Sequence, residues 1–202
     1  MTGLRRRTAA LLPAAVAVAC ALPIGGAQAD PATDNTATAI VEQDDARVAD
    51  LAWDVSRRKG DEAVTHHNAA TARARCLRCR ATAIAFQIVL VSGSPEQVAP
   101  INTAEAVNVE CTDCVAIAQA RQFVRVVPSR MRLTGAGRAR LAAVRERLEA
   151  LLTQDLTPEQ VHQAVEAEED EVLAVLAEEL VVSDEPDREA WERRMLQATD
   201  LA

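Results

Sequence analysis

The sequence predicts an α+β fold, in which a small antiparallel β-meander built on two C-x-x-C hairpins precedes a C-terminal helical region of two to three helices. Three observations support this prediction. A stretch containing C-x-x-C occurs twice between residues 68 and 127, and the matches after the cysteines fall on alternate positions. After Pro128 the apolar period changes to the spacing of an amphipathic helix.

The repeat defines the expected strands. Its first copy reads NAATARARCLRCRATAIAFQIVLV from Asn68 to Val91, and its second reads NTAEAVNVECTDCVAIAQARQFVRV from Asn102 to Val126. One residue after the second cysteine, both continue as A-x-A-x-A-x-Q-x-V-x-V. Alternation predicts a short strand before each C-x-x-C and a longer strand after it. Two strands joined by a tight connection form a β-hairpin, so we expect the cysteines at the hairpin tips.

The N-terminal segment has the pattern of an export signal. Arg5, Arg6 and Arg7 precede an apolar run, and a small-x-small cleavage pattern ends at Ala29. A lipid anchor at Cys20 is the less favoured alternative. We therefore predict a signal peptide over residues 1–29 and a secreted, extracellular protein.

The remaining chain divides by composition. Residues 30–47 are rich in Thr, Ala and Asp and predict a disordered leader. A β-domain with the duplicated hairpins is expected over residues 48–128, and a helical region over 129–202. The first strand of the β-domain is expected near Leu51–Val55, with Trp53 as its large core residue.

The two long strands differ in the face opposite the repeated Ala, Gln and Val positions. In the first copy that face is apolar, so this strand is expected to be central and buried on both sides. In the second copy it carries Arg121 and Arg125, which predicts an edge or solvent-facing strand and places any binding surface beside these arginines. Gln87 and Gln122 occupy matching positions, and we interpret them as a structural polar contact.

The helical region shows two amphipathic segments and a shorter third. Thr157 is an N-cap candidate, with proline after it and Gln160 completing a capping box. A short third helix is expected around Trp191. The helices are expected to pack on each other, as in a coiled coil, or on the small-residue face of the sheet. The apolar positions of the first segment are Leu141, Val144, Leu148 and Leu151.

Four cysteines remain after signal cleavage: Cys76, Cys79, Cys111 and Cys114. In an exported protein an even number of cysteines favours disulfides, and each pair would staple one hairpin end. Bridges between the two hairpins stay possible if their tips lie together. The alternative is a metal site in which all four thiolates hold zinc or iron, and a third interpretation is a thiol-redox protein. We favour disulfides, with no metal and no cofactor.

Charge and motifs exclude several functions. Removing the signal takes away three arginines and no acid, which changes the net charge from −8 to −11. So acidic a protein is a poor binder of nucleic acid, and the mature chain has no apolar run long enough to span a membrane. The sequence has no H-E-x-x-H, G-x-S-x-G or P-loop motif and indicates no catalytic residues.

The repeat resembles a group of uncharacterised exported proteins of actinobacteria. The residues that carry the resemblance are the two C-x-x-C copies with their A-x-A-x-A-x-Q-x-V-x-V continuations, within residues 51–127. The group implies no activity. The sequence therefore favours an exported, non-enzymatic, disulfide-stabilised protein that binds an unknown protein or envelope partner.

Overall fold

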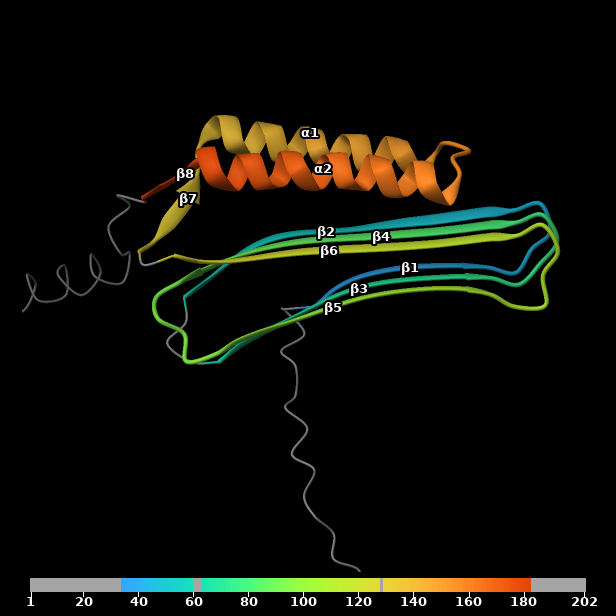
Figure 1. Cartoon of the computed structure of the whole chain (residues 1–202), viewed down its shortest axis with the longest axis horizontal. Helices are drawn as coiled ribbons and strands as arrows, with labels where there is room; N and C mark the ends of the chain where they lie inside the picture. The colour runs from blue at the N-terminus through green and yellow to red at the C-terminus, as the bar shows by residue number, and fades with distance from the viewer. Residues whose placement is uncertain (1–33, 60–62, 128, 183–202) are drawn as a thin grey trace, which may run out of the picture.

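The protein is a two-layer parallel β-solenoid covered on one face by a helical hairpin (Figure 1). The computed structural model describes residues 34–59, 63–127 and 129–182. The predicted export signal, Cys20 and the predicted helix around Trp191 lie outside the described residues. The strands of the solenoid are β1 (Asp34–Val41), β2 (Arg47–Lys59), β3 (Val64–Ala74), β4 (Arg80–Ser92), β5 (Val98–Asn108) and β6 (Val115–Val127).

Each sheet contains alternate strands of the chain. One sheet has the order β1-β3-β5 and the other β2-β4-β6, and all four strand pairings are parallel. One rung of the solenoid is therefore a strand in the first sheet, an arc, and a strand in the second sheet. The chain makes three such rungs, stacked in register.

The prediction of an antiparallel β-meander is wrong. The strands on either side of each C-x-x-C do not pair with each other; they lie in different sheets. The period-two pattern is the same for a hairpin and for an arc, because both contain two strands and a tight connection. The two copies pair instead, so that Asn68 lies beside Asn102 and Gln87 beside Gln122.

The prediction of a disordered leader over residues 30–47 is wrong for the part that the structure describes. Residues Asp34–Val41 form β1, which pairs with β3 along its whole length. The register places Asn35 beside Asn68, so this segment is a third copy of the repeat. It begins with the same N-x-A-x-A pattern as the other two copies but contains no cysteine.

Alanine fills the space between the two sheets. The residues packed there are mostly alanines, together with Val41, Cys76 and Cys79. Ala37, Ala72 and Ala83 are fully buried. Small side chains let the two layers approach closely, so this interior is thin and contributes less apolar area per residue than a core of leucine and phenylalanine.

A ladder of asparagines crosses this interior. Asn35 Nδ2 donates to Asn68 Oδ1 at 2.7 Å, and Asn68 Nδ2 donates to Asn102 Oδ1 at 2.8 Å. Asn68 Nδ2 also lies 3.1 Å from the carbonyl oxygen of Ala85 and 3.0 Å from that of Arg121, in the opposite sheet. The ladder therefore connects all three rungs and both layers.

The larger hydrophobic core lies between the second sheet and the helices. Helix α1 (Gly135–Leu152) and helix α2 (Pro158–Glu178) cover this sheet, and a short hairpin of β7 (Met131–Leu133) and β8 (Leu180–Val182) closes their base. The capping box predicted for Thr157 and Gln160 is present. Trp53, Phe86 and Phe123 form a row of rings on the sheet, with centroids 5.7 and 6.1 Å apart.

Two expectations for the long strands are confirmed. Strand β4 is central and buried on both faces between its two ends. Gln122 Nε2 donates to Gln87 Oε1 at 2.7 Å, which makes these residues a structural contact between adjacent rungs.

Ion pairs join the two helices. Arg140 of α1 lies 2.8 Å from Glu171 and 2.8 Å from Glu178 of α2. The hydrogen bond from Arg140 lowers the pKa of Glu171. At the opposite end of the helices, the hydrogen bond from Arg47 lowers the pKa of Asp155 in the same direction.

We predict that Asn68→Ala destabilises the fold by about 3 kcal/mol, because the buried carbonyls of Ala85 and Arg121 lose their donor. Asn102→Ala at the exposed end of the ladder serves as the matched control and is expected to cost about 1 kcal/mol. Equilibrium unfolding in urea measures both. Equal losses in the two variants would contradict the ladder's central role.

We predict that stability falls as the pH drops below about 4, the ordinary carboxyl range. Glu171 and Asp155 have pKa values below those of the unfolded chain, so their contribution is present above that range and is lost as they take up protons. Urea unfolding between acid and neutral pH measures the slope. Arg140→Gln should make the slope shallower; an unchanged slope would show that the α1–α2 ion pairs do not contribute.

Candidate functional site

The predicted cysteine sites lie on two of three stacked arcs, along the side of the solenoid where β1, β3 and β5 end. The arcs span residues 42–46, 75–79 and 109–114. In each arc the residue before the last position has a positive φ: 59° at Asp45, 52° at Arg78 and 56° at Asp113. The amide of Asp45 donates to the carbonyl of Leu77 at 2.9 Å, and the amide of Arg78 donates to that of Thr112 at 2.9 Å. The arcs therefore share a left-handed residue before their last position and continue the stacking of the strands. The third arc is one residue longer and has a second positive φ, 46° at Glu110.

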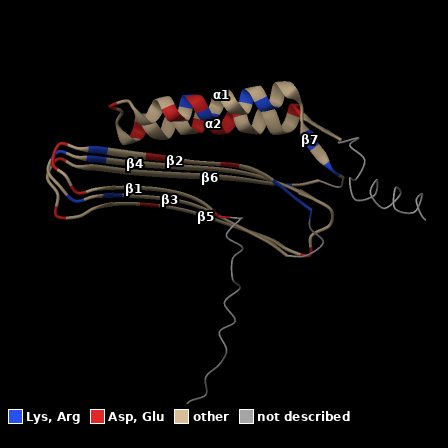
Figure 2. Ribbon diagram, turned by 180° about the vertical axis from the view of Figure 1, so that it is seen from behind, with Lys and Arg blue, Asp and Glu red and all other residues tan. Residues whose placement is uncertain are grey.

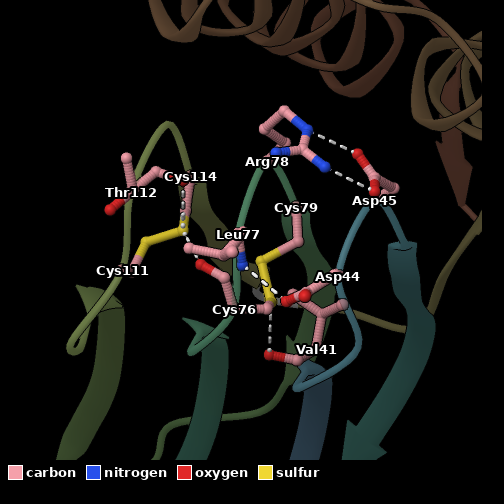
Figure 3. The surroundings of a disulfide bond; sticks show 10 residues. All are labelled: Val41, Asp44, Asp45, Cys76, Leu77, Arg78, Cys79, Cys111, Thr112 and Cys114. Atoms are coloured by element: carbon pink, nitrogen blue, oxygen red, sulfur yellow. Dashed lines mark hydrogen bonds and ion pairs between the residues drawn. A yellow bond between two sulfur atoms is a disulfide. The ribbon is translucent and has the colours of Figure 1, made fainter.

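The disulfides form within each C-x-x-C (Figure 3). Cys76 is bonded to Cys79 and Cys111 to Cys114, with Cα–Cα distances of 6.0 and 5.9 Å. In the cysteine-free first arc, Gln43 and Ala46 occupy the equivalent positions, and the amide of Ala46 donates to the carbonyl of Gln43. Because the first arc forms without a bridge, the disulfides stabilise the other two arcs and are not required for the arc conformation.

Polar contacts also join the arcs. Arg78 binds the carboxylate of Asp45 with two hydrogen bonds, at 2.7 and 2.8 Å, and the amide of Leu77 donates to Asp44 at 2.9 Å. The hydrogen bond from Arg78 lowers the pKa of Asp45. Hydrogen bonds and an ion pair thus join neighbouring arcs, and each disulfide closes a single arc. This side of the solenoid is therefore an architectural element.

Within residues 34–59, 63–127 and 129–182, no group of three or more His, Cys, Asp and Glu side chains is placed to hold a metal ion. In the same ranges, none of the helices is both apolar enough and long enough to cross a membrane.

A different site lies on the side of the solenoid opposite the arcs, between the end of β2, strand β7 and the first half of α1. It is a cleft of about 390 Å³. We call it the basic cleft, because four arginines surround an apolar floor. The arginines are Arg57, Arg132, Arg138 and Arg145, and the apolar residues are Trp53, Val55, Leu90, Leu133, Leu141 and Ala142.

A second, adjoining cleft of about 290 Å³ extends this surface. It shares Arg57 and Leu90 with the basic cleft, and its other basic residues are Arg58, Lys59 and Arg130. Among the described residues, no acidic side chain lines either cleft. Figure 2 shows basic positions, in blue, on β7 and on α1.

The arginines of the basic cleft differ in their partners. Arg138 Nη1 donates to the carbonyl of Leu133 at 2.7 Å, and Arg145 pairs with Glu149 at 2.8 Å. The side chains of Arg57 and Arg132 make no hydrogen bond or ion pair with another residue in the part of the chain that the structure describes. Both line the cleft, so their guanidinium donors are available to an anion bound there.

The floor of the basic cleft is rigid and apolar. Trp53 stacks on Phe86 with an interplanar angle of 22°, and Phe86 is fully buried. Leu141 and Leu133 close the floor from the helical layer and from β7. A ligand with an anionic head and an apolar body would contact both kinds of surface at once.

The sequence placed the binding surface elsewhere. Arg121 was expected beside it, but its Nε lies 2.6 Å from Glu169 of α2, so it joins the sheet to the helices. The basic cleft was missed because its arginines are far apart in the chain. The available signal was two basic groups, Arg57-Arg58-Lys59 at the end of β2 and Arg130 with Arg132 after β6. The parallel register brings the ends of β2 and β6 together, and the docking of α1 adds the helical arginines.

No family model matches this chain, and no curated protein or solved structure matches it either.

We predict that mass spectrometry of the unreduced protein shows the mass of two disulfides, one within each C-x-x-C. Replacing Cys76 and Cys79 together by serine should cost about 2 kcal/mol, because a bridge across so short a loop removes little chain entropy. Urea unfolding measures the loss. Bound zinc, or four reactive thiols, would contradict the disulfide assignment and favour the four-thiolate metal site or the thiol-redox interpretation.

Proposed function

We propose that this protein is an exported, non-enzymatic binding module of the cell envelope or its surroundings, and that it binds an anionic ligand in the basic cleft. The observation that carries this proposal is the cleft itself. Four arginines line an apolar floor, with no acidic residue among the described lining residues, in a chain whose net charge is −8.

Two features support export. The N-terminal sequence has the pattern of a signal peptide, and the cysteines of both C-x-x-C pairs are disulfide-bonded. Disulfides persist in oxidising compartments outside the cytosol. The ladder and the bridges give a rigid scaffold, which suits a protein that must hold a binding site outside the cell.

The chemistry of the cleft favours a small amphiphilic anion. Arginine presents a planar fork that matches a carboxylate or a phosphate. The volume of about 390 Å³ falls in the range of small-molecule sites. The negative charge of the whole protein opposes the approach of a long polyanion such as nucleic acid. A short anionic head on an apolar chain or ring avoids that repulsion and covers the floor around Trp53.

Octyl phosphate is a suitable probe, because it has a phosphate head and an apolar body of cleft size. In a Trp191→Phe background, Trp53 is the only tryptophan and reports directly on the floor of the cleft. We predict a saturable change in Trp53 fluorescence with octyl phosphate. Octyltrimethylammonium, which has the same chain and the opposite charge, should give none.

Charge variants test the role of the arginines. Arg57→Gln with Arg132→Gln should weaken octyl phosphate binding about tenfold or more, since each lost contact is a charge-assisted hydrogen bond. The matched control is Arg47→Gln with Arg75→Gln, which removes the same charge beside the arcs. Equal effects of the two double variants, or no saturable binding by the parent, would contradict the proposal.

A further inference from the structure

The two ends of the solenoid differ in how their strand edges are protected. Strands β1 and β2 form one end, and β5 and β6 form the other (Figure 1). Because neither sheet closes on itself, each end presents backbone donors and acceptors that no other described strand satisfies.

The β1/β2 end carries charged residues that block pairing. Asp50 Oδ2 accepts a hydrogen bond from the amide of Thr38 at 2.7 Å, so the side chain occupies a donor on the open edge of β1. Asp50 and Asp54 stand in register with Ala83 and Gln87, which face the interior of the next rung. Inward-pointing charge at an edge disfavours the addition of another strand.

The β5/β6 end lacks inward-pointing carboxylates, and the blunting feature on its open β5 edge is a proline, Pro100, near the start of the strand. In register with Asp50 and Ala83, strand β6 has Ala118. The amide of Val109, just after β5, donates to the carbonyl of Ala74, so odd-numbered residues of β5 direct their backbone groups toward β3. Even-numbered residues therefore direct theirs toward the open edge. Pro100 belongs to this set, which is why a proline without an amide hydrogen is tolerated there.

We infer that the β5/β6 end binds the same end of a second copy of this chain, in a closed two-fold dimer with antiparallel pairing. Asn102 Nδ2 reaches the carbonyl of Ala120 at 3.1 Å, which places Ala104 of β5 and Ala118 of β6 at one level of the solenoid. A two-fold axis at that level pairs each of these alanines with its counterpart in the second copy. Both have outward backbone groups, so each pair exchanges two hydrogen bonds.

The neighbouring positions fit the same axis. Asn102 comes opposite Ala106 of the second copy, and Ala116 comes opposite Ala120 of the second copy. These are small or uncharged residues, so no like charges meet in the centre of the contact. The surface is its own complement, as a two-fold interface requires.

Charge favours the same arrangement at its margins. The antiparallel register brings the third arc of one copy level with the C-terminal half of β6 in the other. Asp113 lies in that arc and Arg125 in that half of β6. Both are exposed, and neither makes an ion pair with a residue in the described ranges. The dimer therefore pairs Asp113 with Arg125 of the second copy, twice by symmetry.

A head-to-tail stack is disfavoured. It would place Asp50 and Asp54 of the next copy over Ala118 and Gln122, and so bury unpaired carboxylates against the alanine interior. The protected β1/β2 end thus limits assembly to two copies.

Sedimentation velocity of the full exported chain tests this inference. We expect a reversible dimer and no larger species as the concentration rises. Ala118→Asp, which copies the residue at the Asp50 position onto the open end, should give a monomer with an unchanged circular dichroism spectrum. Its melting temperature should match that of the parent at concentrations where the parent is monomeric, because dimerisation itself stabilises the folded chain.

A charge swap supplies an independent test. Arg125→Asp should weaken dimerisation about tenfold, and adding Asp113→Arg should restore it. The second substitution keeps a backbone conformation that Arg78 adopts at the equivalent position of the arc before it. Because Asp113 lies within electrostatic reach of Arg78, Asp113→Arg alone is the control for a loss of stability in the arcs. A monomer at every concentration, a series of growing oligomers, or a dimer unaffected by Ala118→Asp would each overturn the inference.

Discussion

The structure depends on the in-register stacking of three equivalent rungs. Parallel pairing places identical positions of the repeat side by side, and the buried asparagine ladder makes the register specific. Asn68 has 1% exposure and donates or accepts along the ladder in both directions. A slip by one residue would move this amide from the interior to the outer face and leave polar backbone groups unpaired. An interior of alanine alone would lose little free energy on such a slip, because it has no buried side-chain amides.

The sequence indicated most local elements correctly and the pairing wrongly. Alternating positions predicted the long strands, and the apolar residues on both faces of β4 predicted that it is central. Thr157 and Gln160 indicated the start of α2. The sequence did not distinguish parallel from antiparallel pairing, because an arc and a hairpin have the same sequence pattern. The repeat of asparagine at 35, 68 and 102 was the missing signal, since identical side-chain amides at nearly equal spacings of 33 and 34 residues favour stacked rungs.

The candidate site could not be found in the same way. Arg57 lies at the end of one strand, Arg132 in a short strand of another sheet, and Arg138 in a helix. Only the docking of α1 on the second sheet brings them to one apolar floor. The two sides of the solenoid, at opposite ends of the strands, then differ in role. Hydrogen bonds and the Arg78–Asp45 ion pair join the disulfide-closed arcs on one side, and the other side presents the basic cleft. Both features rest on the parallel register.

Nuclear Overhauser contacts between backbone protons test that register most directly. The stacked solenoid predicts contacts between equivalent positions of successive copies, such as the amide regions of Asn68 and Asn102 and of Gln87 and Gln122. Close Hα–Hα contacts across each C-x-x-C, joining β3 to β4 and β5 to β6 within one copy, are the signature of antiparallel hairpins. Their presence would contradict the stacked rungs.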